Sequence, residues 1–404
     1  MNTENKKKLM LLGGLRYLLP VIEEAHKEGY HVITCDYLPN NIAHKFSDEF
    51  YNVSVIDKEA VLEVARKCEI DGIMSFAVDP GVVTAAYVAE KMNLPFQGSA
   101  ETVAILQDKS RFRKFLYEHG FNVPHARGYD NLESALGDFE FFNWPIIVKP
   151  VDSAGSKGVS RVDSPHQLEE AVKIALKESH CGKFIIEDFI EKDGPSSDSD
   201  CFAIDGKLVF CSFSDQHFDS QASNPYTPAS YTWPSNMPKW AQTELKNELQ
   251  RLMTLLNIKT GIFNIETRLG KNGETYIMEV SPRGGGNRLA EMLNYATGSN
   301  LIKNAVRAAV GDRPDSLVTP EYKDYIAEII LHSDEDGLFQ NIDIKCQKDI
   351  EIIETDLWVE NNDIVSAFTG ANNAIGTLVL RSSSKNKLED AINNISSWCK
   401  IMVK

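Results

Sequence analysis

The sequence predicts a protein of mixed α/β and α+β architecture, and three observations favour this fold class. The first hundred residues alternate short apolar runs with amphipathic segments, which is typical of parallel strands joined by helices. The middle of the chain contains apolar runs separated by a glycine-containing turn, as in antiparallel hairpins. Strand-like runs return from Tyr325 and end in an amphipathic helix over 387–398. Because 404 residues suffice for two or three domains, we expect domains over 1–100, 101–312 and 313–404.

The first of these domains is expected to contain a small parallel sheet. Apolar runs predict strands over 8–12, 31–35 and 72–76, and Gly13-Gly14 turns the first strand into a following helix. Ligands of such sheets bind at the carboxyl ends of the strands. A dinucleotide-binding site is not expected, because the turn after the first strand lacks the three-glycine spacing G-x-G-x-x-G.

Two helices are predicted in the middle of the chain. Asp108 is suited to cap a helix from Lys109 to His119, which closes at Gly120. A second helix, near 243–257, carries leucine and methionine at helical spacing. We assign that apolar stripe to the core and give it no function.

The loop from Asp152 to Val159 is the most informative segment. The apolar run 145–148 ends in Lys149, and the loop that follows consists of small residues and a second lysine, Lys157. Such a loop lets backbone N–H groups approach phosphate oxygens, and the lysines add positive charge. The segment therefore predicts a phosphate-binding loop.

A predicted hairpin places two carboxylates further along the chain. Strands over 262–269 and 274–281 flank a turn at 270–273, so that Glu266 faces Ile277 and Glu279 lies one diagonal step away, roughly 7–8 Å. Alternation puts the following polar residues on one face: Asn264, Glu266, Arg268, Glu279, Ser281 and Arg283. The opposite face, towards the core, receives Phe263, Ile265, Met278 and Val280. Two carboxylates beside an arginine suit a magnesium–triphosphate, and a solvated polar face is the alternative.

These motifs, in this order, resemble the ATP-grasp superfamily over most of the chain, most clearly from about Lys109 to Gly311. The resemblance implies a Rossmann-like pre-ATP-grasp domain and a two-subdomain ATP-grasp fold with a mobile lid over about 125–190. It also implies a small C-terminal α+β domain, similar to that of stand-alone L-amino-acid ligases and short carbamoyl-phosphate-synthase-like proteins. The implied activity is that of a carboxylate–amine ligase that works through an acyl-phosphate and releases ADP and phosphate. Its cofactors would be ATP and magnesium, with manganese as an alternative.

The resemblance also assigns residues. Lys109 and Lys149 would contact the ATP phosphates, and Arg283 would lie beside the reacting phosphate. The phosphate-covering loop would comprise Ser153, Ala154, Gly155, Ser156, Lys157 and Gly158. The adenine would lie against the strand end formed by Glu187, Asp188, Phe189 and Ile190. Glu266 and Glu279 match the metal pair. Ser281 stands where relatives often carry a metal-binding asparagine, which leaves the choice between one and two metal ions open. The ribose contact is unassigned, because no glutamate stands in register over 194–200.

The acceptor substrate is less well defined. Arg288 follows three glycines and is suited to grip a substrate carboxylate, with a structural ion pair as the alternative. His217 is a candidate general base or a locally packed loop residue. Three functions stay open: a carboxylate–amine ligase with an amino acid as one substrate, a carboxylase acting through carboxyphosphate, and a non-catalytic nucleotide-binding module.

Composition restricts partners and compartment. A net charge of −16 argues against nucleic acid as a partner. No apolar stretch approaches the roughly 18 residues of a membrane span. The seven cysteines are scattered and never form Cys-x-x-Cys, which suits a reducing compartment. We therefore expect a cytoplasmic protein without a nucleic-acid or membrane partner. The resemblance implies small-molecule carboxylate and amine substrates. The oligomeric state stays open between a monomer and a homodimer, the state usual among similar proteins.

Overall fold

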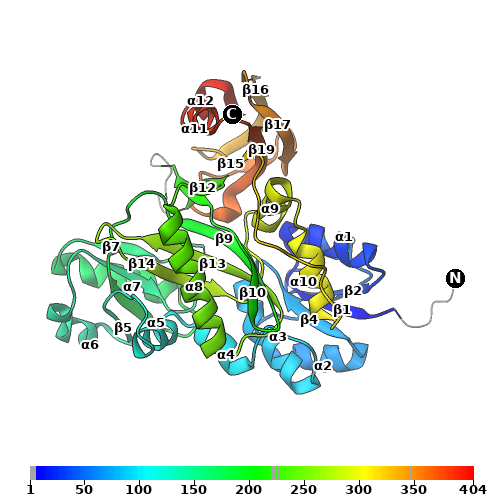
Figure 1. Ribbon diagram of the computed structural model, residues 1–404, viewed down its shortest axis with the longest axis horizontal. Helices are drawn as coiled ribbons and strands as arrows, with labels where there is room; N and C mark the ends of the chain where they lie inside the picture. The colour runs from blue at the N-terminus through cyan, green and yellow to red at the C-terminus, as the bar shows by residue number, and fades with distance from the viewer. Residues whose placement is uncertain (1–5, 154, 220–223, 225–226, 346) are drawn as a thin grey trace.

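The computed structural model describes residues 6–153, 155–219, 224, 227–345 and 347–404. Within these residues the strands form five sheets. Figure 1 shows the N-terminal part and the part around β5–β8 on opposite sides of a central sheet, with the C-terminal part above them. Ala154, which was predicted to belong to the phosphate loop, lies outside the described residues.

The N-terminal sheet has the order β3-β2-β1-β4, and all its strands are parallel, as predicted. Alternate residues of β1 enter different cores: Leu9 and Leu11 pack with α1, whereas Met10 and Leu12 pack with α2 and α3. Both faces of the sheet are therefore covered, as a parallel sheet requires. Its elements are β1 (Lys8–Leu12), η1 (Arg16–Leu18), α1 (Leu19–Lys27), β2 (His31–Cys35), β3 (Glu49–Tyr51), α2 (Lys58–Cys68), β4 (Gly72–Ser75) and α3 (Asp79–Met92).

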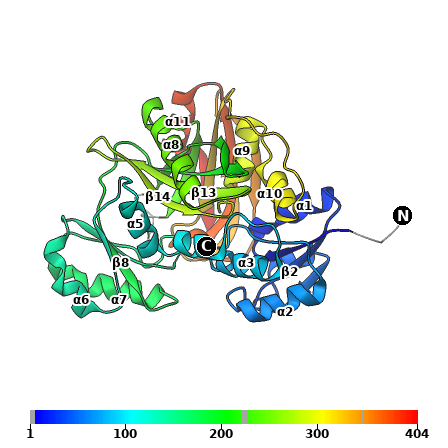
Figure 2. The ribbon, with the colours of Figure 1, turned by 60° about the horizontal axis from the view of Figure 1, so that its bottom comes forward.

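A separate four-stranded antiparallel sheet occupies the region expected to be the lid. Its order is β5-β8-β6-β7, and α7 packs on it over a core of its own. This unit stands apart at one end of the molecule in both views (Figures 1 and 2). Its elements are β5 (Ala126–Tyr129), α6 (Leu132–Gly137), β6 (Ile146–Pro150), β7 (Ser160–Val162), α7 (Leu168–Glu178) and β8 (Phe184–Asp188).

The central sheet, in the order β10-β9-β13-β14, is antiparallel. Helix α8 covers one face, and its leucines at 245, 249 and 252 are buried there, as predicted. The other face carries polar side chains. The elements are α4 (Ala100–Gln107), α5 (Lys109–Glu118), β9 (Ser197–Ile204), β10 (Lys207–Cys211), α8 (Lys239–Leu255), β13 (Gly261–Leu269) and β14 (Thr275–Ser281).

The predicted register of the β13–β14 hairpin is wrong. The turn is one residue longer than expected, because Leu269 pairs with Thr275 and the Gly270 N–H donates to the Glu274 carbonyl at 2.9 Å. A bulge next to Glu266 then skips Met278 and brings Glu266 directly opposite Glu279. As a consequence Ile277, and not Met278, joins the core.

The C-terminal part contains two sheets. The larger has the order β11-β12-β15-β19-β17, so that residues 215–233 join strands more than ninety residues later in the chain. The smaller has the order β18-β16-β20. The helix expected over 387–398 is two helices that meet at Asn394. The elements are β11 (Asp215–Phe218), β12 (Pro228–Trp233), α9 (Leu289–Thr297), α10 (Leu301–Ala309), β15 (Tyr325–His332), β16 (Gly337–Ile344), β17 (Glu351–Leu357), β18 (Ile364–Val365), β19 (Ala374–Ser382), α11 (Lys385–Asn393), α12 (Ile395–Trp398) and β20 (Cys399–Val403).

Two expectations from composition concern the described residues as a whole. Among all the residues that the structure describes, no helix has the length and apolarity needed to cross a bilayer. The cysteines in the same residues are all free thiols, and all but Cys181 are buried.

Candidate functional site

Four carboxylates gather on the polar face of the central sheet. Glu266 lies directly opposite Glu279 on one side and Asp198 of β9 on the other. Asp200 lies two residues along β9, opposite Asn264, and the Asn264 amide donates to Asp198 at 2.8 Å and to Asp200 at 3.3 Å. Neither aspartate was predicted as a site residue, although the alternation Asp198-Ser199-Asp200 on one strand was a signal for them.

The carboxylates repel one another in a buried setting. Burial and the charges of Glu279 and Asp198 raise the pKa of Glu266 to about 8. Burial also raises the pKa of Asp198 to about 6 and that of Asp200 to about 7. The Oδ2 atom of Asp200 is buried and has no hydrogen-bond partner among the described residues. Oxygen ligands with unbalanced negative charge are what a hard divalent cation requires, so these side chains fit the predicted magnesium site.

Lys109 links the hairpin to the phosphate loop. Asp108 caps helix α5 by accepting from the N–H groups of Ser110 and Arg111, at 2.9 and 3.0 Å. The cap places Lys109 in the first turn, where its Nζ donates to the Ser153 carbonyl at 2.9 Å and lies 3.6 Å from Oε2 of Glu279. Lys109 therefore lies beside the phosphate loop, and its contact with the ATP phosphates stays a prediction.

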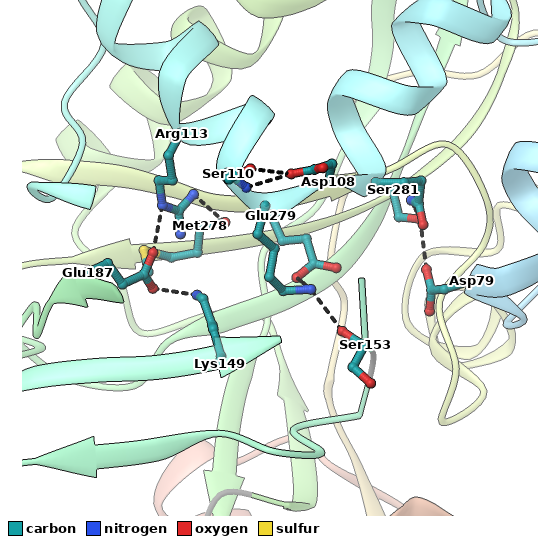
Figure 3. A network of polar contacts seen from close by, with 12 residues as sticks. Asp79, Asp108, Ser110, Arg113, Lys149, Ser153, Glu187, Met278, Glu279 and Ser281 are labelled. Atoms are coloured by element: carbon teal, nitrogen blue, oxygen red, sulfur yellow. Dashed lines mark hydrogen bonds and ion pairs between the residues drawn. The ribbon is translucent and has the colours of Figure 1, made fainter. Parts of the chain in front are cut away.

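Lys149 is held by a buried carboxylate. Its Nζ pairs with Glu187 at the end of β8, and Arg113 donates to the same carboxylate at 2.9 Å (Figure 3). Burial lowers the pKa of Lys149, and the Glu187 charge opposes that shift. Burial alone would raise the pKa of Glu187, but Arg113 and Lys149 outweigh it and lower the value to about 2. Arg113 was not predicted; it lies one helical turn after Lys109 and also donates to the Met278 carbonyl at 2.8 Å.

Arg283 is oriented by a residue of the N-terminal part. Asp79, at the start of α3, accepts from Nε of Arg283 at 2.9 Å and from Nη2 at 2.8 Å. Burial would raise the pKa of Asp79, and the Arg283 charge lowers it below the ordinary value. The Ser281 hydroxyl donates to the same aspartate at 3.0 Å and accepts from Gln107 at 2.7 Å. Ser281 is therefore engaged with Asp79 and Gln107, and its role as a metal ligand stays a prediction.

The phosphate loop has a glycine-dependent backbone. Gly155, Ser156 and Gly158 have φ angles of 66°, 58° and 71°, in the left-handed region that glycine adopts most easily. A Cβ on Gly158 would lie 2.9 Å from Pro150, so the loop returns close to the end of β6. The Ser153 hydroxyl donates to the Glu178 carbonyl at 2.8 Å, which ties the start of the loop to α7.

Trypsin should cleave after Lys157 in the free protein, because this lysine is exposed in a loop without regular structure. Magnesium and ATP should slow the cleavage if the loop closes over phosphate. Fragments are followed on denaturing gels, with Lys157→Gln as the control that removes this cut. Equal cleavage rates with and without nucleotide would contradict a phosphate-covering role.

The strand end expected to hold adenine is fixed by its neighbours. The Asp188 N–H donates to the His125 carbonyl at 2.9 Å, and Arg161 lies 4.6 Å from the ring centroid of Phe189. Arg268 donates to the Ile190 carbonyl at 2.9 Å. The adenine contacts of residues 187–190 stay a prediction.

Arg288 forms the ion pairs that were its alternative role. It pairs with Glu291 at 2.9 Å and with Glu354, and it donates to Thr377 at 2.7 Å. The contact with a substrate carboxylate stays a prediction. His217 lies within 3.2 Å of the Thr232 hydroxyl, and burial lowers its pKa, so its role as a base is likewise untested.

Part of the chain matches a known protein family. Residues 142–291 match the model of the ATP-grasp domain, a stretch that includes Lys149, Glu266, Glu279 and Arg283. The carbamoyl phosphate synthase large chain of Ralstonia nicotianae is 26% identical over 341 residues, which cover 79% of this chain and 31% of that protein. The chain thus spans about a third of the length of such curated relatives.

Solved structures share the whole fold. The L-amino acid ligase from Bacillus licheniformis superposes with a TM-score of 0.82 over 100% of both chains, at 22% identity. The biotin carboxylase domain of the Hydrogenobacter thermophilus 2-oxoglutarate carboxylase, solved with MgADP and bicarbonate, gives 0.75 over 98% of this chain and 91% of that one, at 15% identity. At these identities the likeness establishes the fold, and the resemblance to the ATP-grasp superfamily is confirmed.

Proposed function

We propose that this chain, which carries an ATP-grasp domain, is an ATP-dependent ligase that joins a carboxylate to an amine through an acyl-phosphate. The observation that carries the proposal is the direct opposition of Glu266 and Glu279, with Lys109 at 3.6 Å from Glu279. Two carboxylates suited to bind a metal ion and a lysine suited to bind phosphate thus lie next to one another.

The lysines bind and align the phosphates. Lys109 is anchored to the Ser153 carbonyl, and Lys149 is held in a fixed direction by Glu187. Both ammonium groups retain further donors for phosphate oxygens, because a lysine has three N–H groups. Closure of the 153–158 loop would exclude water, which otherwise hydrolyses an acyl-phosphate.

Glu266 and Glu279 would hold magnesium, or manganese in its place, with Asp198 and Asp200 close by. When bound, the ion would neutralise the charge on the β- and γ-phosphates. The raised pKa of Glu266 would then return towards its ordinary range, because a positive charge favours the carboxylate.

Arg283 would stabilise the transferred phosphoryl group. Two of its N–H groups go to Asp79, and a third, on Nη1, donates to the Gly284 carbonyl at 3.1 Å. Two of the five N–H donors of a guanidinium are therefore left for a substrate. Asp79 fixes the plane of the guanidinium and thereby sets the direction in which those donors point.

Hydroxylamine should trap the acyl-phosphate as a hydroxamate. The protein is incubated with magnesium, ATP, hydroxylamine and single amino acids, and both hydroxamate and nucleotide products are measured. We expect hydroxamate together with ADP and phosphate. Phosphate release with bicarbonate alone would instead support the carboxylase function, and AMP with pyrophosphate would contradict the mechanism.

A further inference from the structure

Glu328 is a buried carboxylate without a hydrogen-bond partner. It lies at the centre of β15, where its relative exposure is 0%, between Ile326 and Ile330, which belong to the apolar core. Neither of its carboxylate oxygens has a hydrogen-bond partner among the described residues. Burying such a group is costly unless a partner compensates it, so an unpaired one calls for a ligand or another explanation.

The charged side chains around Glu328 are two acids and one base, namely Glu291, Glu354 and Arg288. Arg288, the N-cap residue of α9, carries the positive charge that opposes Glu328, but Glu291, Glu354 and Thr377 already accept four hydrogen bonds from its five N–H donors. Burial, reinforced by Glu291 and Glu354, raises the pKa of Glu328 despite the opposing charge of Arg288. One guanidinium thus faces three carboxylates, and Glu328 is the one left without a contact.

Glu328 lies close to the ATP and metal site. Its cross-strand neighbour on β12 is Tyr231, whose hydroxyl donates to Oδ2 of Asp198 at 3.1 Å and accepts from Asn287 at 3.1 Å. Asp198 in turn lies opposite Glu266. A single tyrosine therefore separates Glu328 from the carboxylates that would hold the metal.

We propose that Glu328 receives the protonated primary amino group of a substrate, so that one of the two compounds joined by this protein carries an ammonium group, as an amino acid does. The inference rests on the proposed function, because the compound would be the carboxylate substrate, whose ammonium group takes no part in the bond that is formed and can stay protonated. An ammonium group supplies both the hydrogen bonds and the positive charge that this group of side chains lacks.

Binding is tested with the twenty L-amino acids as single probes, in the presence of MgADP, by thermal shift and calorimetry. At least one amino acid should bind, and the analogue with a hydroxyl in place of its amino group, such as L-lactate for L-alanine, should bind at least about tenfold more weakly. Glu328→Gln should weaken binding of the amino acid by about 10- to 100-fold and leave MgADP binding unchanged. The exposed Glu321→Gln is the matched control.

Two outcomes would overturn the inference: no amino acid binds, or Glu328→Gln binds as wild type does. Either can occur with MgADP binding intact, which leaves the proposed function standing. Failure to bind MgADP would instead count against the proposed function.

The Tm of the free protein provides a second test. Replacing Glu328 should raise the Tm if its carboxylate serves to bind a ligand, and should lower the Tm if the carboxylate serves only to stabilise the fold. Glu328→Met should raise the Tm of the free protein, because replacing an unpaired buried acid with an apolar side chain of similar size is often stabilising. The pKa of Glu328 is higher in the folded protein than in the unfolded chain. Protonation of Glu328 therefore favours folding, and this contribution to stability is lost as the pH rises through the folded-state pKa. The Tm advantage of Glu328→Met should therefore widen from about pH 5 to about pH 8.

The titratable and charged groups around Glu328 are Tyr17, Tyr231, Arg288, Glu291 and Glu354. A lower Tm for Glu328→Met at all these pH values would contradict a ligand-binding role.

Discussion

Glu279→Gln should reduce ATP turnover to background while the protein stays folded. Glu279 lies opposite Glu266 and 3.6 Å from Lys109, so the substitution removes a proposed metal ligand and a lysine partner together. A neutral amide binds magnesium far more weakly than a carboxylate. Removing one of several repelling charges should also leave the Tm equal or higher, because Glu279 contributes to the raised pKa of Glu266.

Phosphate release and thermal unfolding check this result. Glu274→Gln, an exposed position in the turn of the same hairpin, is the control and should keep wild-type activity. A folded Glu279→Gln protein that releases phosphate at the wild-type rate would exclude the metal assignment.

Arg283→Met should lower the rate by about 10²–10³ while nucleotide binding persists, because the proposed role of the guanidinium is to stabilise the transferring phosphoryl group. It should also lower the Tm, since the largely buried Asp79 carboxylate would lose its only ion-pair partner among the described residues and keep only the Ser281 hydroxyl. Stability and activity are separable here. The double variant with Asp79→Asn and Arg283→Met also removes the negative charge of Asp79 that Arg283→Met leaves without a cation. It should recover much of the Tm lost in Arg283→Met but none of the activity.

Asp79→Asn alone is the matched probe of orientation. It leaves the guanidinium in place but weakens both hydrogen bonds that fix its plane, so a smaller rate loss than for Arg283→Met is expected. If Arg283→Met lowers the Tm but not the rate, or if the double variant has full activity, Arg283 is structural and has no part in the reaction.

Local patterns explain what the sequence could predict. The parallel strands of the N-terminal sheet follow from short apolar runs, and the start of α5 follows from the capping residue Asp108. Alternation alone placed Glu266 and Glu279 on one face of the hairpin. Each of these features depends on residues close together in the chain.

Long-range pairing explains what the sequence could not predict. The contacts of Arg283 with Asp79 and of Arg113 with Glu187 join segments 204 and 74 residues apart. The register error arose from one extra residue in the turn and a bulge beside Glu266, neither of which changes the hydrophobic pattern enough to be read. Glu328 did leave a signal, as the one acidic residue inside the apolar run 326–331, but its lack of a partner is visible only in the fold.

Oxygen-18 transfer tests the acyl-phosphate most directly. The protein is incubated with magnesium, ATP and a mixture of the twenty L-amino acids labelled with oxygen-18 in their carboxylates, and the phosphate and nucleotides are analysed by mass spectrometry. An acyl-phosphate mechanism predicts ADP and phosphate that carries one oxygen-18 atom, and loss of both in Glu279→Gln. Unlabelled phosphate, or oxygen-18 found in AMP, would contradict phosphorylation of an amino-acid carboxylate at this site.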